Sequence, residues 1–184
     1  YNAEIYLMDA DGSNMVRLTD NEGREFLTPH GLWSPDGRYI AFAYDHDGSF
    51  ETIDVYLMDA GCMDRPEECE DSLVQLTEEQ GWCFAGGWSP DGSKILIDID
   101  LDGGDSEESW EVYVMDVDEQ EATQLTESGG ERSWSAGWLA DEDRILFLSG
   151  RDGDDDIYLM DSDGDNVVNL TDNSADDYSP DLWP

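Results

Sequence analysis

The chain carries very little positive charge. It has 8 lysine and arginine residues against 47 aspartate and glutamate residues, a formal net charge of -39, and Lys94 is its single lysine. Nucleic acids are bound through lysine and arginine set against phosphates, so this composition excludes nucleic acid as a partner and disfavours anionic lipid. The charge instead favours bound cations such as Ca²⁺, a basic protein partner or a saline medium.

Long hydrophobic runs are also missing. No apolar stretch approaches the ~18 residues of a membrane-spanning helix, and the first residues lack the basic start and apolar centre of a signal peptide. We therefore expect no membrane span, although a mature exported protein would have the same features. With 39% hydrophobic residues over 184 positions, the chain is still apolar enough to fold around one core.

One short pattern occurs four times. An aliphatic residue, tyrosine, a second aliphatic residue, methionine and aspartate recur at 5–9, 55–59, 112–116 and 157–161. Their aspartates are 50, 57 and 45 residues apart, a spacing typical of β-propeller blades. A Trp-Ser-Pro-Asp-Gly turn recurs at 33–37 and 88–92, with altered copies at 138–141 and 178–181. A Leu-Thr-acid triplet recurs at 18–20, 76–78, 125–127 and 170–172.

The segments between these patterns are expected to be strands. They are short, rich in β-branched and aromatic residues and bounded by Gly, Pro and Asp, and none has the 3.6-residue period of a helix. Each repeat divides into four antiparallel strands. The third strand, such as 157–160, is apolar on both faces, as a sheet packed between two other sheets requires. Asp36 and Asp91 are predicted to be turn residues, because Pro-Asp-Gly suits a tight turn.

The fixed order of the three patterns resembles the β-propeller repeat of TolB, a periplasmic translocation protein. The resemblance extends over essentially the whole chain and implies an all-β propeller of about four blades, each with four antiparallel strands. Complete repeats would span approximately 26–77, 78–126 and 127–171, and a split repeat would combine 172–184 with 1–20. One blade would thus be shared between the N- and C-termini. The altered turn at 138–141 departs from the pattern, so that repeat should keep its strands and lose its tight turn.

The split repeat has no clear second strand. Its first strand would come from 178–181, and its third and fourth strands from the N-terminal residues. Two alternatives follow: a thinner closing blade, or a gap that another chain fills by strand addition. The second alternative predicts a homo-oligomer or polymer with contacts at Ile5, Tyr6, Leu7, Tyr178 and Trp183.

Acidic clusters occupy the loops between the expected second and third strands. Closely spaced carboxylates near glycine suit Ca²⁺, which takes six to eight oxygen ligands in flexible geometry. The acids that end the Leu-Thr triplets are expected on the same face of the propeller. The predicted calcium ligands are Asp45, Asp47, Asp98, Asp100, Asp102, Asp152, Asp154 and Asp156, together with Asp20, Glu78, Glu127 and Asp172. A merely solvated acidic face is the alternative.

Two of the three cysteines are close in sequence. Cys62 and Cys69 fall within one insertion, 61–71, whose length permits a disulfide, and a disulfide would place the protein outside a reducing cytosol. Cys83 is expected at the other end of its blade as a buried free thiol, with an intermolecular bond as the alternative. We therefore expect an extracellular or cell-surface location, with the periplasm as the alternative.

The sequence offers little support for catalysis. The two histidines, His30 and His46, belong to no Gly-x-Ser-x-Gly, His-Glu-x-x-His or Cys-x-x-Cys motif. We therefore expect a protein that is not an enzyme: an extracellular, calcium-binding propeller with a structural, self-assembling role. The alternatives are a TolB-like module that binds a protein partner on one ring face, and an accessory domain of a hydrolase.

Overall fold

The computed structural model describes residues 3–20, 23–26, 33–46, 48–49, 51–78, 81–100, 102, 109–140 and 143–180. The first strands along the chain are β1 (Tyr6–Leu7), β2 (Val16–Arg17), β3 (Arg24–Phe26), β4 (Tyr39–Asp45), β5 (Asp54–Asp59) and β6 (Val74–Gln75). They are followed by β7 (Trp82–Trp88), β8 (Lys94–Asp100), β9 (Trp110–Asp116) and β10 (Glu121–Gln124). The last are β11 (Ser133–Trp138), β12 (Arg144–Ser149), β13 (Asp156–Asp161) and β14 (Val168–Asn169).

Short helical turns occur in one connection. The 3-10 helices η1 (Ala60–Asp64), η2 (Pro66–Glu68) and η3 (Glu70–Ser72) join β5 to β6. None of the helices in the described ranges has the length and apolar character that crossing a membrane requires.

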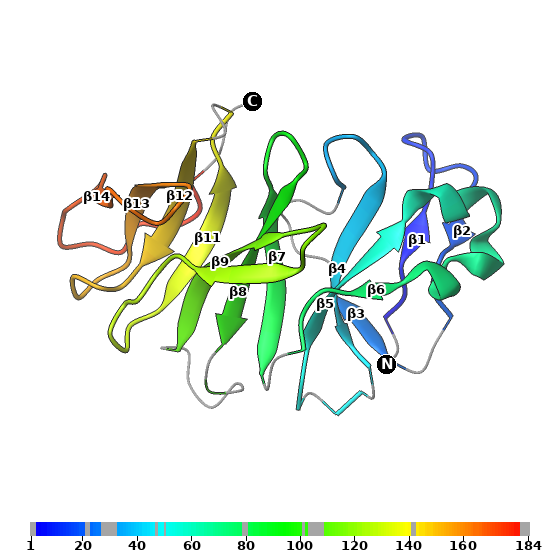
Figure 1. Ribbon diagram of the computed structural model, residues 1–184, viewed down its shortest axis with the longest axis horizontal. Coiled ribbons are helices and arrows are strands. Elements are labelled where there is room, and N and C mark those ends of the chain that lie inside the picture. The colour runs from blue at the N-terminus through cyan, green and yellow to red at the C-terminus, as the bar shows by residue number, and fades with distance from the viewer. Residues whose placement is uncertain are drawn as a thin grey trace.

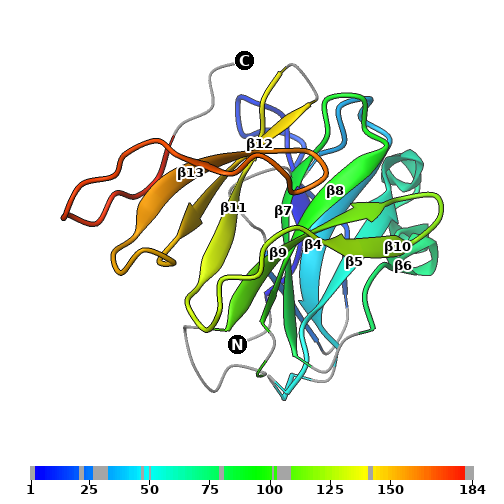
Figure 2. The same ribbon diagram turned by 60° about the vertical axis from the view of Figure 1, so that its left-hand side comes forward.

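The strands form sheets in chain order. Strands β3 to β6, β7 to β10 and β11 to β14 each make a four-stranded antiparallel sheet, and β1 pairs with β2 in a two-stranded sheet. The sheets stand in a curved row, with β1 and β2 at one end and β14 at the other (Figure 1, Figure 2). The predicted all-β fold with four-stranded antiparallel blades is confirmed.

The middle sheet buries both of its faces. Ile95 and Ile97 of β8 are in a core cluster with Val55 of the first sheet. Leu96, between them, is in a second cluster with Phe147 of the third sheet. Side chains of one strand alternate between faces, so neighbouring residues stabilise different interfaces, each contributing roughly 1.5–3 kcal/mol through burial. This arrangement matches the apolar pattern on both faces that the sequence shows.

A buried carboxylate joins the second sheet to the third. Ser135 of β11 donates to Asp98 of β8 twice, from its N–H to Oδ1 at 2.9 Å and from its hydroxyl to Oδ2 at 3.0 Å. The close approach requires glycine at position 86 in β7, because a Cβ there would lie 1.8 Å from Ser135 Oγ. Burial raises the pKa of Asp98 to about 7, although both Ser135 bonds favour the charged form.

The insertion between β5 and β6 packs the N-terminal hairpin onto the first sheet. The predicted disulfide between Cys62 and Cys69 is present, and both cysteines are in a buried cluster with Ile5 and Leu18. Cys83 is buried and lies outside this disulfide, as predicted.

The C-terminal segment does not form the expected strand. Residues 171–180 contain no strand, and Asp181 and Trp183 lie outside the described residues. The backbone here is bound elsewhere: the Asp177 N–H donates to the Asp155 carbonyl at 2.6 Å, and the Asp155 N–H donates to Asp176 Oδ1 at 3.3 Å. Within the described part of the chain, β1 and β2 therefore represent the split repeat.

The third repeat keeps its strands despite the altered turn motif. Strands β11 and β12 pair antiparallel, as predicted, and the turn residues 141–142 lie outside the described residues. Trp88 and Trp138 are buried at the ends of their strands, whereas Trp33 is 39% exposed.

The pKa of Asp98 predicts a pH-dependent stability. Its folded value of about 7 exceeds the ordinary value of 3.8, so its contribution to stability is complete below about pH 4 and is lost as the pH rises through 7. In Asp98→Asn the amide can keep both contacts with Ser135 without a charge. We expect this variant to be more stable than the wild type at pH 8 by about 1–4 kcal/mol, and to lose part of the decline between pH 4 and 7. Urea unfolding at each pH measures this, and identical profiles would contradict it.

Candidate functional site

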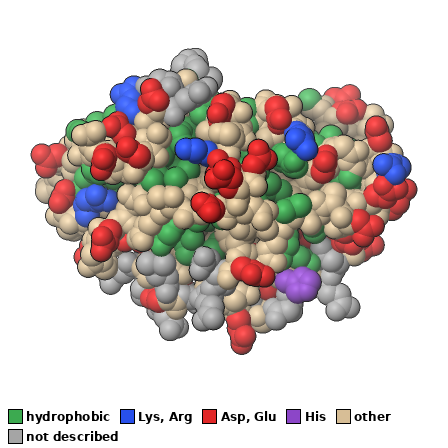
Figure 3. All heavy atoms as spheres, in the orientation of Figure 1, with side chains coloured by type: hydrophobic (Ala, Val, Ile, Leu, Met, Phe, Trp, Pro, Cys, Tyr) green, Lys and Arg blue, Asp and Glu red, His purple; other side chains and the backbone are tan. Residues whose placement is uncertain are grey.

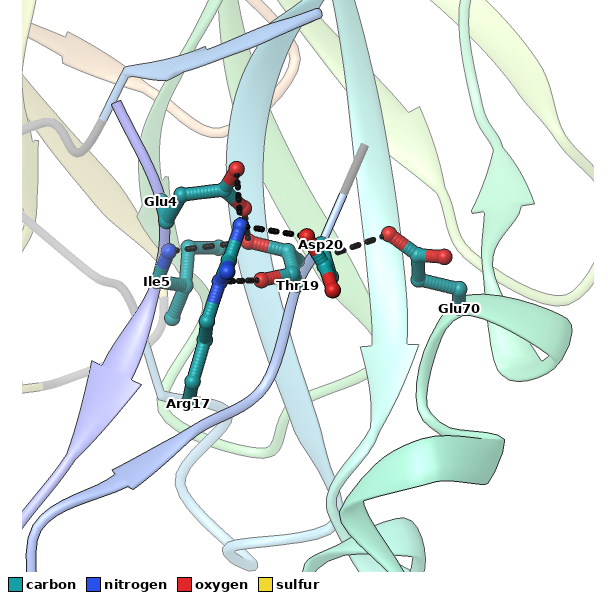
Figure 4. A network of polar contacts seen from close by, with 6 residues as sticks. All are labelled: Glu4, Ile5, Arg17, Thr19, Asp20 and Glu70. Atoms are coloured by element: carbon teal, nitrogen blue, oxygen red, sulfur yellow. Dashed lines mark hydrogen bonds and ion pairs between the residues drawn. The ribbon is translucent and has the colours of Figure 1, made fainter. Parts of the chain in front are cut away.

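A hydrogen-bonded unit forms around the carboxylate that precedes the aliphatic-tyrosine pair of each third strand. In the N-terminal copy, Thr19 Oγ1 accepts the Ile5 N–H at 2.9 Å and donates to Glu4 Oε2 at 2.8 Å (Figure 4). Arg17 donates to the Thr19 carbonyl and to Glu4 Oε1, both at 2.6 Å. This acid–threonine staple, an acid at or near the start of a third strand and a threonine just after the fourth, holds the two strands together.

The three complete blades repeat the acid–threonine staple. In each, the threonine hydroxyl accepts the N–H of the residue that follows the acid and donates to the carboxylate of the acid. The pairs are Asp54 with Thr77, Glu111 with Thr126 and Asp156 with Thr171. Sequence reasoning assigned Asp156 to calcium and missed Glu4, Asp54 and Glu111. The signal was present, since an acid precedes the aliphatic-tyrosine pair in all four copies.

Three other predicted calcium ligands are buried in second strands. Asp45 ends β4 and is fully buried, and Asp98 binds Ser135 as described above. Asp100, at the end of β8, is 1% exposed and accepts the Ser109 hydroxyl and, at 3.2 Å, the Asp102 N–H. Asp98 and Asp100 are therefore bound to groups of the protein itself.

The remaining predicted ligands, apart from the partly buried Asp154, are exposed where they are described. They are Asp20, Glu78, Asp102, Glu127, Asp152 and Asp172, and Asp47 lies outside the described residues. Asp20 forms an ion pair with Arg17 at 2.7 Å, and Asp152 accepts the Tyr158 hydroxyl at 2.7 Å. Among the described residues, no three or more His, Cys, Asp or Glu side chains are grouped so that they could hold a metal ion. The calcium site therefore stays a prediction.

The aspartates of the Pro-Asp-Gly turns have a structural role, as predicted. Asp36 accepts the Ser34 hydroxyl at 2.7 Å and the Arg38 N–H at 2.9 Å. Ser89 and Asp91 repeat the hydroxyl bond at 2.7 Å. The serine hydroxyl, together with a backbone N–H, lowers the pKa of each aspartate.

A cleft of about 270 Å³ lies where the C-terminal segment meets the third sheet. Arg132 forms an ion pair with the buried carboxylate of Asp155, and its hydrogen bond lowers the pKa of that carboxyl. Beside it, the pKa of Asp154 is raised by burial and then by the neighbouring charges of Asp156 and Asp176. Tyr178 borders the cleft. Carboxylates are thus crowded around a single arginine.

The residues predicted for assembly have different environments. Ile5 is buried and Leu7 is half-buried, whereas Tyr6 is 54% and Tyr178 is 56% exposed. Trp183 lies outside the described residues. The two tyrosines are therefore the accessible members of this set within the described part of the chain.

Comparison with known proteins identifies the family. The model of the TolB beta propeller domain matches residues 70–184. The chain belongs to this family. The TolB homologue of Chlorobaculum tepidum is 29% identical over 129 residues, which are 70% of this chain and 25% of that protein. TolB from Acinetobacter baumannii has the same fold, with a TM-score of 0.68 and 21% identity over 91% of this chain and 37% of that one.

A peptidase is also similar to this TolB-family chain. The uncharacterized peptidase YuxL of Bacillus subtilis is 27% identical over 106 residues, 58% of this chain and 14% of that protein. The chain thus spans a quarter or less of the length of these two curated relatives. Family membership confirms the resemblance to TolB that the repeats indicate.

The acid–threonine staple predicts that removing its threonine hydroxyl lowers the stability of the fold. Thr126→Val preserves the side-chain shape but leaves the Val112 N–H without its hydroxyl acceptor and Glu111 Oε2 without the threonine donor, while Ser128 still donates to Glu111 Oε1. We expect the free energy of unfolding to fall by about 1–3 kcal/mol in denaturant titrations, because these groups are buried. The control Thr123→Val, at an exposed position in β10, should change it by less than about 0.5 kcal/mol. Equal effects would contradict the structural role of the staple.

Proposed function

We propose that the chain is a non-catalytic protein-interaction module that presents an acidic surface to a basic partner protein. The observation that carries this proposal is the distribution of its 47 acidic residues. Several are bound internally in the acid–threonine staples, whereas many others lie across the molecular surface with few lysine or arginine side chains among them (Figure 3). An acidic surface attracts basic proteins and accelerates their encounter.

Membership in the TolB family is compatible with this proposal but does not decide between binding and catalysis, since a peptidase is among the relatives. His46 is exposed, and its ring packs edge-on against Tyr44 with centroids 5.7 Å apart. His30 lies outside the described residues.

The disulfide is relevant to the cellular location of the protein. Cys62 and Cys69 are joined, and disulfides persist in oxidising compartments. We therefore propose a location outside the reducing cytosol, extracellular or at the cell surface, with the periplasm as the alternative.

An affinity experiment tests the interaction function. The folded chain is immobilised beside the same chain after reduction and unfolding, which has identical composition and charge. We expect extracts of the producing organism to yield a basic protein retained by the folded chain alone. The purified protein should then bind in calorimetry with an affinity that falls as NaCl rises. Retention by neither form, or by both equally, would reject the proposal.

Calcium binding is a second candidate, favoured by the crowding of carboxylates around Asp154. Burial raises the pKa of this carboxyl most, and the charges of Asp156, Asp176, Asp177 and Asp152 raise it further; a bound cation would relieve the repulsion among these charges.

A melting experiment tests the calcium candidate. At Ca²⁺ well above its dissociation constant we expect the melting temperature to exceed that in EGTA by about 5–10 °C, with NaCl at matched ionic strength ineffective. Asp154→Asn should reduce the shift, and the control Asp118→Asn, at an exposed turn, should not. An unchanged midpoint in wild-type protein would exclude the site.

A further inference from the structure

A groove of about 570 Å³ lies between the first and second sheets. Residues 75–78, at β6 and just after it, form one wall, and Met115, Gln120 and Ala122 of the second sheet form the other. The edge strands β6 and β10 lie side by side there (Figure 2). Both walls belong to complete four-stranded sheets. The volume is within the range of about 300–1,000 Å³ that is typical of ligand sites.

The floor of the groove is apolar and its rim is polar. Leu76 and Met115 are 7% and 4% exposed and belong to the same core cluster. At the rim, the amide nitrogen of Gln75 donates to the Thr77 carbonyl at 2.7 Å and to Asp54 Oδ2 at 3.2 Å. This orientation leaves the amide oxygen of Gln75 as a hydrogen-bond acceptor.

The charge at the groove is negative. Among the described residues that line it, Glu78 is the one ionisable side chain, and it is exposed. On the opposite wall, Gln120 lies between the exposed residues Glu119 and Glu121. Lysine and arginine side chains place their aliphatic stems on apolar surfaces and keep their charged groups at polar ones. The groove has both kinds of surface.

The second and third sheets provide an internal comparison. The sequence Gln-Leu-Thr-Glu occurs at 75–78 and again at 124–127, so each interface has the same residues on one wall. At the second interface the turn of the third sheet packs directly on that wall. A Cβ at Gly164 would lie 3.0 Å from the Leu125 carbonyl oxygen and 3.5 Å from Leu125 Cδ2.

Two residues of the second sheet explain why the first interface is more open. By strand register, Glu119 has the position of Gly164, and Ala122 has the position of Val167. A glutamate at this point of the turn cannot approach the opposite wall as closely as a glycine can. The small side chain of Ala122 then leaves space above Met115, with which it pairs.

We propose that this groove binds a lysine or arginine side chain of the basic partner protein, with the aliphatic stem on Leu76 and Met115 and the cationic group at Glu78. This inference rests on the protein-interaction function proposed above and names a contact site for the partner. Charge complementarity favours a basic partner, because the chain has a net charge of -39. A second copy of the chain is a poorer occupant, since it has the same charge and would be repelled.

A short cationic peptide tests the groove directly. The probe is acetyl-Ala-Arg-Ala-amide, titrated into the full chain with isotope-labelled methionine methyl groups. We expect the nuclear magnetic resonance signal of Met115 to shift saturably, and that of Met160, its 1% exposed equivalent in the third sheet, to stay in place. The same peptide with citrulline, a neutral analogue of arginine, should bind about fivefold more weakly or worse. Equal binding of the two peptides would overturn the proposal.

A charge-neutralising variant with a matched control locates the cationic group. Glu78→Gln should weaken binding of the arginine peptide about fivefold or more. Glu127→Gln makes the same change at the exposed glutamate of the second Gln-Leu-Thr-Glu sequence and should leave binding unchanged. Equal loss in both variants would show attraction to the overall charge, and the proposal would fail.

A groove-filling variant tests the position of the stem. Ala122→Trp, at an exposed position of β10, should occupy the groove and abolish the saturable shift of Met115. Val167→Trp, at the equivalent position of the third sheet, should leave the shift unchanged. Urea midpoints establish that both variants are folded. Binding to Ala122→Trp at wild-type strength would overturn the proposal.

The captured basic protein separates this inference from the function on which it rests. Binding of that protein should weaken in Ala122→Trp and persist in Val167→Trp. If it binds Ala122→Trp as tightly as wild type, the groove proposal fails while the interaction function stands. If neither the protein nor the peptide binds the wild-type chain, both fail. Self-association of the wild-type chain in sedimentation, abolished by Ala122→Trp, would overturn the proposal in favour of a second copy.

Discussion

A sheet that is apolar on both faces must have another layer on each side. In this protein the middle sheet meets that requirement through Ile95 and Ile97 on one face and Leu96 on the other. The curved row of sheets follows from this constraint, because every blade added to one face presents a further apolar face. The disulfide-bonded insertion meets part of the same requirement by packing against the N-terminal hairpin.

The second constraint is that the fold must accommodate many carboxylates. A buried carboxylate is tolerated when donors surround it, as at Glu111, which receives the hydroxyls of Thr126 and Ser128. Asp98 is held differently, by two bonds from one serine across a sheet boundary, and its raised pKa shows that these bonds do not fully offset burial. Exposed carboxylates avoid this cost through solvation. One residue type thus supplies strand connections, turns and surface charge within a single domain.

Because carboxylates serve in strand connections, in turns and at the surface, the sequence could predict only part of the structure. The repeats predicted the sheets and the Asp36 turn because both depend on local patterns, apolar alternation and Pro-Asp-Gly chemistry. The role of Asp156 was not predictable from its loop, since its partner Thr171 is 15 residues away and is adjacent only in the folded blade. The expected strand at Tyr178 failed for a similar reason. Its segment is held by Asp155, which no local pattern indicates.

The acid–threonine staple has a consequence for how such a chain could evolve. Its acid and threonine always belong to the same repeat, 15 residues apart in three copies and 23 in the copy that contains the insertion. Gene duplication could therefore add a blade that arrives with its internal bonding complete, as in other repeat proteins. The bond between Asp98 and Ser135 lacks this property, because the positions equivalent to Asp98 in β4 and β12 are Ala43 and Leu148. Duplication could therefore change the number of blades, whereas the bond between Asp98 and Ser135 requires the second and third blades to stay neighbours.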